Sequence, residues 1–296
     1  MFSITKDNDL NTLEIKSINN RVYGKIHLND GASLQALTLN GHAIIQNLEP
    51  LIYKDTYASS ILFPFANRIK DGIYTYNNKE YQLEINQKEE NNALHGLVYN
   101  KPFKETESFT NEDSAWIVLE YTEEKESIGF PYTYKIQLKY TFTETHLELN
   151  LSVINTDSKA FPFTLGWHPY FNSDHLHDSI LEFDTSKKLI IGERNITTGT
   201  ENLNSFKSLK IENQKLDDCW ILDSNSIQFY TPKYKFSMES SAKNNFLQAY
   251  TPPKLNTIAI EPTTGVSNSF NNKIGLDILK PNDTYSITWK LNIENN

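Results

Sequence analysis

The sequence predicts an all-β fold, a large antiparallel β-sandwich with few short helices. Hydrophobic and polar residues alternate with a period of two in several segments, and helical periodicity is nowhere sustained over ten residues. Aromatic residues, which favour strands, are abundant, with 16 Tyr, 16 Phe and 4 Trp. No change of composition and no linker rich in Pro, Gly or Ser divides the chain, so we expect residues 1–296 to form a single domain.

The clearest alternation lies between residues 132 and 153. Hydrophobic residues occupy every second position of 132–142 and, after a break at residues 143–145, of 147–153. Polar residues fill the positions between them. This pattern predicts an antiparallel hairpin with one buried face.

Further strands and turns follow from the same kind of signal. Alternation over residues 115–122 and 285–293 predicts two more strands, the second close to the C-terminus. Asn77-Asn78 and Asn40-Gly41 are dipeptides suited to tight turns between paired strands, because both residue types tolerate a positive φ. We therefore expect a hairpin at each of them.

Composition narrows the class of partner and the compartment. The net charge of −9 argues against nucleic acid or an anionic membrane, since both need clustered Lys and Arg, and a neutral small molecule fits better. Cys219 is the single cysteine, so the chain can form neither an internal disulfide nor a cysteine-built metal site. The first residues lack a secretory signal pattern, and no apolar run reaches 18 residues, so we expect a cytoplasmic protein.

Three stretches carry polar residues that strands and turns alone do not require. Asn67-Arg68 follows an apolar run, and its fork of donors suits vicinal hydroxyls or a carboxylate; the alternative is a surface arginine paired with an acid. His95 precedes a glycine that permits close backbone approach, although a lone loop histidine is more often structural. His168 stands in FTLGWHPYFN (163–172), either as a hydrogen-bonded core histidine or as a group that moves a proton.

Two later stretches add carboxylates. Asp217 and Asp218 precede an aromatic strand in LDDCWIL (216–222), where aspartates are also common as turn residues. Glu261 ends the apolar strand 258–260, and a carboxylate there is costly unless it is hydrogen-bonded or needed for function.

A histidine pair in DHLHD (174–178) raises the question of a metal. His175 and His177 could ligate a metal ion with a neighbouring aspartate. No further ligand is evident in the sequence, so we interpret the segment as a solvated loop and expect no metal.

The residues singled out favour proton transfer. They comprise two histidines, a strand-end glutamate, an aspartate and an Asn-Arg pair. They include no serine or cysteine in a nucleophile motif, no glycine-rich phosphate-binding loop and no clear set of metal ligands. A histidine and a glutamate can act as acid and base near neutral pH. A glycosidase with paired carboxylates is an alternative, but it would leave the histidines without a role. The residues alone thus predict a sugar-handling β-sandwich.

At six stretches the sequence closely resembles the aldose 1-epimerase (galactose mutarotase) family. They occur in the family's order and read FANRIKDG (65–72), NNALHGLVYN (91–100), GWHPYFN (166–172), LDDCW (216–220), FLQAYTPP (246–253) and IAIEPTTGVSN (258–268). The resemblance implies a large antiparallel β-sandwich and a cofactor-independent isomerase. Its substrates would be free hexoses such as glucose and galactose, whose α and β anomers it interconverts.

The resemblance also implies a role for individual residues. His168 would protonate the ring oxygen as general acid, Glu261 would take the C1 hydroxyl proton as general base, and His95 would stabilise charge near the ring oxygen. The aromatic neighbours of His168 would form packing and cleft wall. The sugar hydroxyls would be bound by Asn67, Arg68, Asp217 and Gln248, with Asp218 as the alternative to Asp217 because the family often has Asp-His where this chain has Asp-Asp.

Two other functions stay open. A hexose-6-phosphate 1-epimerase of the same fold would need a basic cluster for the phosphate, and Arg68 is the one arginine in the six stretches. A non-catalytic carbohydrate-binding sandwich would not need a matched acid and base. The resemblance leaves the preferred sugar undetermined, and we expect a monosaccharide as the partner of a monomer or weak dimer.

Overall fold

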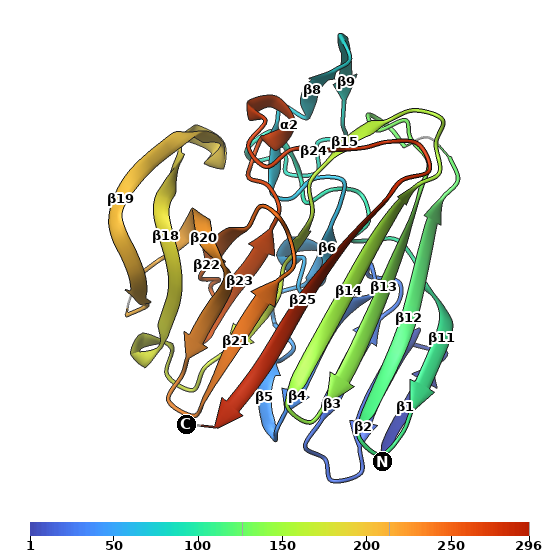
Figure 1. Cartoon of the computed structure of the whole chain (residues 1–296), viewed down its shortest axis with the longest axis vertical. Helices are drawn as coiled ribbons and strands as arrows, with labels where there is room; N and C mark the ends of the chain where they lie inside the picture. Colours follow the sequence, from blue (N-terminus) through green and yellow to red (C-terminus); the bar gives the residue numbers. More distant parts are fainter. Residues whose placement is uncertain (126, 213, 296) are drawn as a thin grey trace.

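The computed structural model describes residues 1–125, 127–212 and 214–295, and antiparallel strands dominate it (Figure 1). Strands account for 57% of the structure and helices for 5%, which confirms the all-β prediction. The helices of the described residues have three or four residues each: α1 (Tyr53–Thr56), α2 (Ser269–Asn272) and the 3₁₀ helices η1 (Leu176–Asp178) and η2 (Glu193–Asn195). None of them has the length and apolar composition of a membrane span.

The first layer is a five-stranded meander in which each strand pairs with the next in antiparallel register. It contains β1 (Phe2–Asp7), β2 (Thr12–Ser17), β3 (Tyr23–His27), β4 (Ser33–Leu39) and β5 (His42–Ile45). The predicted turn at Asn40-Gly41 joins β4 to β5, and both residues adopt a positive φ, as a tight hairpin requires.

The second layer is a fourteen-stranded sheet. Its main path runs, in spatial order, through β11 (Lys104–Thr110), β12 (Ser114–Glu123), β13 (Tyr134–Thr143), β14 (His146–Asn155), β25 (Thr284–Asn295), β21 (Tyr234–Ser240), β20 (Asp217–Tyr230), β22 (Phe246–Tyr250), β23 (Thr257–Thr263), β16 (Gly166–Trp167) and β6 (Ile61–Leu62). Off this path, β17 (Tyr170–Asn172) pairs with β23, and β18 (Ile180–Ile191) joins β19 (Thr197–Lys210) to β20.

The predicted strands lie in this sheet. β13 and β14 form the expected antiparallel hairpin, and residues in β13 alternate between buried and partly exposed along its whole length. β13 begins at Tyr134, two residues later than the alternation suggests, because the Tyr132 N–H bonds to Phe130 O in the loop after Pro131. The strands predicted at 115–122 and 285–293 correspond to β12 and β25.

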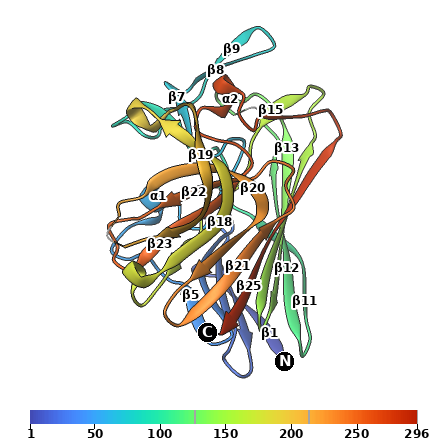
Figure 2. The same ribbon diagram turned by 60° about the vertical axis from the view of Figure 1, so that its left-hand side comes forward.

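Figure 1 shows the five-stranded sheet behind strands β11–β14 of the large sheet, and Figure 2 shows it to their left. The two layers pack closely: a Cβ added to Gly24 on β3 would lie 2.7 Å from the Phe142 ring on β13. The Tyr140 hydroxyl donates a hydrogen bond of 3.0 Å to the carbonyl oxygen of Ala32 in the small sheet. The hydrophobic core between the layers includes residues from both ends of the chain, from Phe2 to Ile293. This arrangement is the expected β-sandwich.

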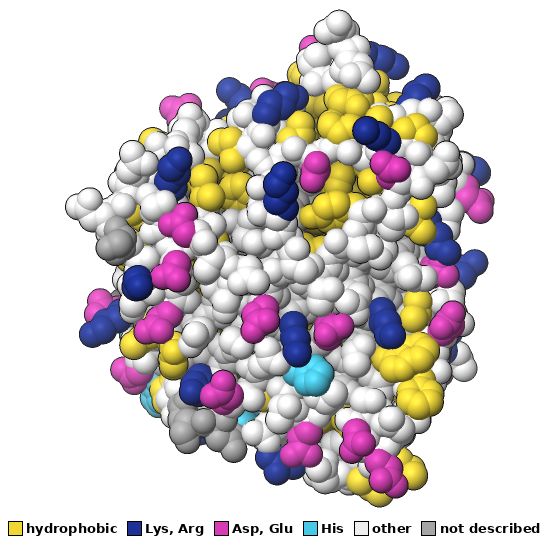
Figure 3. All heavy atoms as spheres, viewed as in Figure 1, with side chains coloured by type: hydrophobic (Ala, Val, Ile, Leu, Met, Phe, Trp, Pro, Cys, Tyr) yellow, Lys and Arg dark blue, Asp and Glu magenta, His cyan; other side chains and the backbone are white. Residues whose placement is uncertain are grey.

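Three two-stranded sheets lie at one end of the sandwich: β7 (Arg68–Lys70) with β10 (Asn92–Leu94), β8 (Ile73–Tyr76) with β9 (Lys79–Gln82), and β15 (Phe161–Phe163) with β24 (Asp277–Leu279). The β8–β9 hairpin turns at Asn77-Asn78, as predicted, and both asparagines have a positive φ. This hairpin projects from the top of the molecule in Figures 1 and 2. Acidic and basic side chains are interspersed over the face in Figure 3.

Candidate active site

A cavity of about 340 Å³ brings together all seven predicted site residues. They come from loops and strands that are distant in sequence. The lining is formed by Asn67 and Arg68 at the start of β7, His95 after β10, His168 between β16 and β17, Asp217 at the start of β20, Gln248 on β22 and Glu261 on β23.

Strand pairing brings three of these side chains together. Gln248 and Glu261 are directly opposite one another in the antiparallel pair β22–β23, so their side chains share one face of the sheet. Asp217 lies opposite Tyr250, two residues from Gln248 on the same strand. The amide nitrogen of Gln248 donates a 2.7 Å hydrogen bond to Asp217 Oδ1 across this diagonal.

His168 is held at a break between two short strands. β16 and β17 both pair with β23, and His168 with Pro169 interrupts them. The His168 N–H donates to Ser60 O at 3.1 Å, and its carbonyl accepts from the Ser59 N–H at 2.8 Å. Its imidazole stacks on the Tyr170 ring, with 4.9 Å between centroids and an interplanar angle of 23°. The main chain and one aromatic ring thus fix the imidazole in the cavity wall.

Trp167 and Phe171, the other two aromatic residues of GWHPYFN (166–172), lie in the core, where they hold the surrounding backbone. Trp167 stacks on Trp289 with 6.4 Å between centroids, and Phe171 packs against Phe236 at 4.6 Å. Both are fully buried.

His168 and Glu261 form a close buried pair. The distance from His168 Nε2 to Glu261 Oε1 is 3.4 Å, and their side chains are only 6% and 4% exposed. Burial disfavours the charged form of each group, so it lowers the pKa of His168 to about 4 and raises the pKa of Glu261 well above its ordinary value. Asp217 raises the pKa of Glu261 further, while the Arg68 guanidinium opposes that rise. These shifts in opposite directions allow the pair to hold one proton across the neutral range.

His95 lies beside His168 in the cavity wall. The two imidazole rings meet edge to face, with 5.0 Å between centroids, and the Tyr57 ring lies 4.8 Å from His95 on another side. His95 adopts φ of 61°, a strained conformation for a residue with a side chain. The next position, residue 96, requires a glycine for two reasons. Its φ of 77° favours glycine, and a Cβ there would lie 2.2 Å from Phe63 O.

Burial shapes the electrostatics of both histidines. It lowers the pKa of His95 well below its ordinary value, and the neighbouring His168 and Arg68 lower it further. Among the described residues, His95 Nδ1 and His168 Nδ1 are buried without a hydrogen-bond partner in the protein.

Arg68 is tied into the cavity wall by several acceptors. Its Nε donates to Glu90 Oε2 and to Gln87 Oε1, both at 3.1 Å, and one terminal nitrogen donates to Asn67 Oδ1 at 3.1 Å. The salt bridge with Glu90 is largely shielded, with the two side chains 14% and 27% exposed. Part of the positive charge at the cavity is therefore neutralised inside the protein.

The adjacent aspartates differ in their surroundings. Asp217 lines the cavity and accepts the Gln248 hydrogen bond, and burial raises its pKa. Asp218 forms an ion pair of 2.6 Å with Lys188 on β18. Successive residues of a strand point to opposite faces, which explains why only one of the two reaches the cavity.

Seven further residues line the cavity and were not predicted: Asp55, Thr56, Tyr57, Gln87, Leu94, Asn195 and Tyr250. A strand-periodicity signal exists for Tyr250, which lies two residues after Gln248 and so on the same face of β22. Leu94 lies in the family-like stretch 91–100. The other five lie outside the six stretches, on the short helices α1 and η2 or in loops, and their positions depend on tertiary contacts.

The histidine pair at 174–178 lies apart from this cavity. His175 precedes η1 and His177 belongs to it, while Asp174 forms an ion pair with Lys233. Over the described ranges, no group of three or more His, Cys, Asp or Glu side chains is arranged to hold a metal ion.

Sequence comparison relates this site to a known family. The family model described as aldose 1-epimerase matches residues 17–292, a span that contains every residue of the cavity. The chain belongs to the aldose 1-epimerase family.

Relatives of this aldose 1-epimerase family member include the protein YihR of Escherichia coli K12, with 25% identity over 278 residues that cover 88% of the chain and 87% of YihR. Human galactose mutarotase is 30% identical over 159 residues. That match covers 51% of the chain and 44% of the human protein.

Solved structures of the family share the fold. A galactose mutarotase-like protein from Clostridium acetobutylicum has a TM-score of 0.86 at 21% identity, over 100% of this chain and 99% of the other. A galactose 1-epimerase from Lactobacillus acidophilus has a TM-score of 0.82 at 18% identity, with the same coverage. At these identities the likeness concerns the fold, and it confirms the predicted galactose mutarotase-like β-sandwich.

Proposed function

We propose that this aldose 1-epimerase family member interconverts the α and β anomers of free aldohexoses by acid–base opening and closing of the sugar ring. The observation that carries the proposal is the pair of His168 and Glu261, 3.4 Å apart and buried in one polar cavity. General acid–base catalysis needs a proton donor and an acceptor held within reach of the same substrate. Burial also keeps the pair at a single proton near neutral pH, because it lowers the pKa of His168 and raises the pKa of Glu261.

In the proposed reaction, His168 protonates the ring oxygen while Glu261 removes the proton from the C1 hydroxyl. The C1–O5 bond breaks, and the electron pair of the former O–H bond forms the aldehyde C=O. Rotation about C1–C2 presents the other face of the aldehyde. Closure then reverses both proton transfers, with Glu261 as the acid and His168 as the base.

This cycle uses a single proton on the pair. In the free protein the pKa shifts place this proton on Glu261, so it first crosses to His168, and ring opening then returns it to Glu261. The two placements have the same net charge, so the reaction needs no proton from solvent between opening and closing. We expect a buried pair to suit such an exchange, because neither step changes the total charge in the cavity.

The remaining residues are assigned to binding. His95 would stabilise charge near the ring oxygen, and its place in the lining, with its ring in contact with the His168 ring, supports this role. Asn67, Arg68, Asp217 and Gln248 would hydrogen-bond the hydroxyls, and Asp217 is favoured over Asp218 because Asp218 is paired with Lys188. Tyr170 would provide an apolar wall against the sugar ring.

The charges around the cavity support an uncharged sugar over a hexose 6-phosphate. Among the described residues of the lining, the carboxylates are Asp55, Asp217 and Glu261, and Arg68 is the one Lys or Arg. Its guanidinium is already paired with Glu90. A phosphate carries close to two negative charges at neutral pH and would meet a net negative cavity.

The single-domain organisation over residues 1–296 stays a prediction. The continuous core from Phe2 to Ile293 supports it.

The test is a rate measurement on freshly dissolved sugars. Polarimetry or proton exchange spectroscopy would follow α-glucose, α-galactose and α-glucose 6-phosphate with and without the protein. We expect the free sugars to equilibrate faster than the spontaneous rate, and faster than the phosphate. No acceleration of any common aldose would refute the proposal, and tight sugar binding without acceleration would favour the carbohydrate-binding alternative. A much larger effect on the phosphate would favour the 6-phosphate epimerase.

A further inference from the structure

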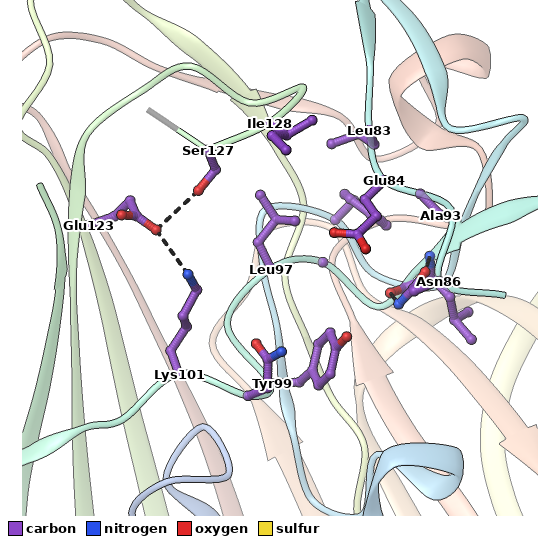
Figure 4. Close-up of a pocket in the computed structure, with 14 residues that line it drawn as sticks. Leu83, Glu84, Asn86, Ala93, Leu97, Tyr99, Lys101, Glu123, Ser127 and Ile128 are labelled. Carbon is purple, nitrogen blue, oxygen red and sulfur yellow. Dashed lines mark hydrogen bonds and ion pairs between the residues drawn. The ribbon is translucent and has the colours of Figure 1, made fainter. Parts of the chain in front are cut away.

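A second cavity of about 470 Å³ lies behind the strip of chain that carries His95 (Figure 4). Leu94 lines both this cavity and the candidate active site, and Ala93, Gly96 and Leu97 line the second cavity. The strip 93–97 is therefore a thin wall with a hollow on each side. Close packing normally fixes a core segment, but a segment between two cavities lacks contact atoms there. Besides the ring contacts of His95 and the close approach of Gly96 to Phe63, hydrogen bonds hold it in place.

Besides the β7–β10 ladder, which pairs Ala93 with Ile69 and Leu94 with Arg68, the main chain supplies two bonds. The His95 N–H donates to Asn67 O at 2.8 Å, and the Leu97 N–H donates to Phe63 O at 2.7 Å. The first bond holds His95 to the residue before β7, and the second holds Leu97 to the residue after β6. The peptide groups of Leu94, immediately before His95, are held from the other side by a side chain.

That side chain is Asn86, in the loop after β9. The Leu94 N–H donates to Asn86 Oδ1 at 2.7 Å, and Asn86 Nδ2 donates to Leu94 O at 2.9 Å. The Asn86 amide offers Leu94 one donor and one acceptor, as a neighbouring strand would, and its second N–H stays free for another acceptor. Asn86 thus stands in for a third strand beside β10. Figure 4 shows Asn86 beside Ala93 at the edge of the second cavity.

The same amide reaches a second wall of the candidate active site. Asn86 Nδ2 also donates to the Tyr57 hydroxyl at 3.3 Å. The Tyr57 ring lies 4.8 Å from the His95 ring and is supported on another side by Tyr99, also at 4.8 Å. One side chain therefore holds both the peptide before His95 and the ring against which His95 packs.

We propose that Asn86 is a positioning residue that fixes the imidazole of His95 for the reaction, through Leu94 and Tyr57. Its effect on rate rests on the proposed function, whereas its effect on the orientation of His95 does not. Asn86 lines the second cavity rather than the candidate active site, so it acts through its neighbours. Asn86→Ala removes all three bonds. Asn86→Asp keeps the acceptor for the Leu94 N–H and removes the donor to Leu94 O.

The experiment compares these variants with Asn100→Ala, which removes an exposed amide from the same second cavity. Nitrogen-15 spectra would report the His95 imidazole, mutarotation would give kcat and KM separately, and thermal unfolding would check the fold. For Asn86→Ala we expect a shifted or broadened His95 signal and a kcat lower by about 10- to 100-fold, because a small misplacement of a reacting group can cost about 100-fold. Asn86→Asp should lie between it and wild type, and Asn100→Ala should match wild type.

The outcomes separate the two proposals. An unchanged His95 signal in folded Asn86→Ala would overturn the positioning role, whatever the activity. A shifted signal together with wild-type kcat would overturn its importance for catalysis. A wild-type protein that accelerates no sugar would refute the proposed function, while the His95 signal would still test the positioning role. Loss of activity in proportion to unfolded protein, with a normal His95 signal in the folded fraction, would mean a structural role only.

Discussion

The Nε2 atom of His168 lies 3.4 Å from Oε1 of Glu261, with both side chains almost fully buried. Both residues are held in this position by contacts with segments that are distant in the sequence. His168 is held by the backbone of Ser59 and Ser60, and Glu261 is placed by its pairing with Gln248 in the sheet. Removing one partner therefore changes proton transfer without removing the elements that build the cavity.

Glu261→Gln should abolish most epimerase activity and leave the fold intact. The amide has the size of the carboxylate but cannot accept the C1 proton, so we expect kcat to fall by about 100- to 10,000-fold, the usual contribution of a general base. Mutarotation assays with thermal unfolding measure both effects. Glu84→Gln, at an exposed carboxylate that lines the second cavity, should retain wild-type activity. A near-normal rate for folded Glu261→Gln would remove Glu261 from the base role.

The acid limb of the pH–rate profile should lie below the ordinary histidine range. Burial lowers the pKa of His168 to about 4, so the free enzyme takes up a second proton on the His168–Glu261 pair only in that region. We expect kcat/KM to stay nearly constant as the pH falls from 7 through the ordinary histidine pKa of about 6.5, with the loss closer to pH 4. Rates measured between pH 4 and 9 test this. An acid limb centred near pH 6.5 would contradict it.

Stability should change with pH in opposite directions for the two partners. The lowered pKa of His168 means that wild-type protein loses stability as the pH falls from about 6.5 towards 4, because the unfolded histidine binds a proton that the folded one does not. The raised pKa of Glu261 means that stability is lost as the pH rises above about 4.5, since the unfolded carboxyl releases its proton first.

Relative to wild type, His168→Asn should therefore gain stability as the pH falls, and Glu261→Gln should gain it as the pH rises. Urea unfolding at pH 5, 6.5 and 8 would show the two trends. Parallel trends for both variants would show that burial is not the main cause of the pKa shifts.

Asp217→Asn should weaken catalysis while Asp218→Asn should not. Asp217 lines the cavity, and loss of one charged hydrogen bond to a sugar hydroxyl costs about 1.5–3 kcal/mol, or roughly 10- to 100-fold in kcat/KM. Asp218 is paired with Lys188 instead and serves as a matched control. Equal effects of the two substitutions would argue against the assignment of sugar binding to Asp217.

Gly96→Ala should destabilise the protein more than Gly41→Ala. Both glycines have a positive φ, 77° and 81°, so both substitutions carry the conformational cost of about 1–2 kcal/mol. A Cβ at Gly41 meets nothing within 4 Å, whereas one at Gly96 would lie 2.2 Å from Phe63 O and must displace backbone beside His95. Urea unfolding gives the difference between them. Equal free energies of unfolding would show that the strip after His95 can move away from Phe63 freely.

The strands and turns can be predicted from the sequence because alternation and turn dipeptides involve only neighbouring residues. Alternation fixes which residues of β13 are buried, and Asn77-Asn78 turns as its chemistry requires. The order of strands in the large sheet is different, because it depends on pairings such as β14 with β25 that join distant segments.

Some residues of the candidate site can likewise be predicted from local motifs, whereas others are placed there only by tertiary contacts. The family-like stretches contain the seven residues that meet in the cavity, since each stretch has a recognisable local pattern. Asn86 lies in a loop and Asn195 ends the 3₁₀ helix η2, both in segments of ordinary polar composition. Their importance arises from contacts with Leu94 and Glu90, which only the folded chain reveals.

The position of β23 also determines when the cavity can form during synthesis. Gly166 pairs with Leu62 on one side and with Thr263 on the other, so three segments on the order of a hundred residues apart become neighbours. A nascent chain that has not yet released β23 from the ribosome has no strand to join β16 and β17 to β22. Pairing over such separations is slow, because the chain must close long loops before it gains contacts. Newly made chains should therefore acquire the cavity only after β23 has left the ribosome, later than the pairing of the strands that precede it.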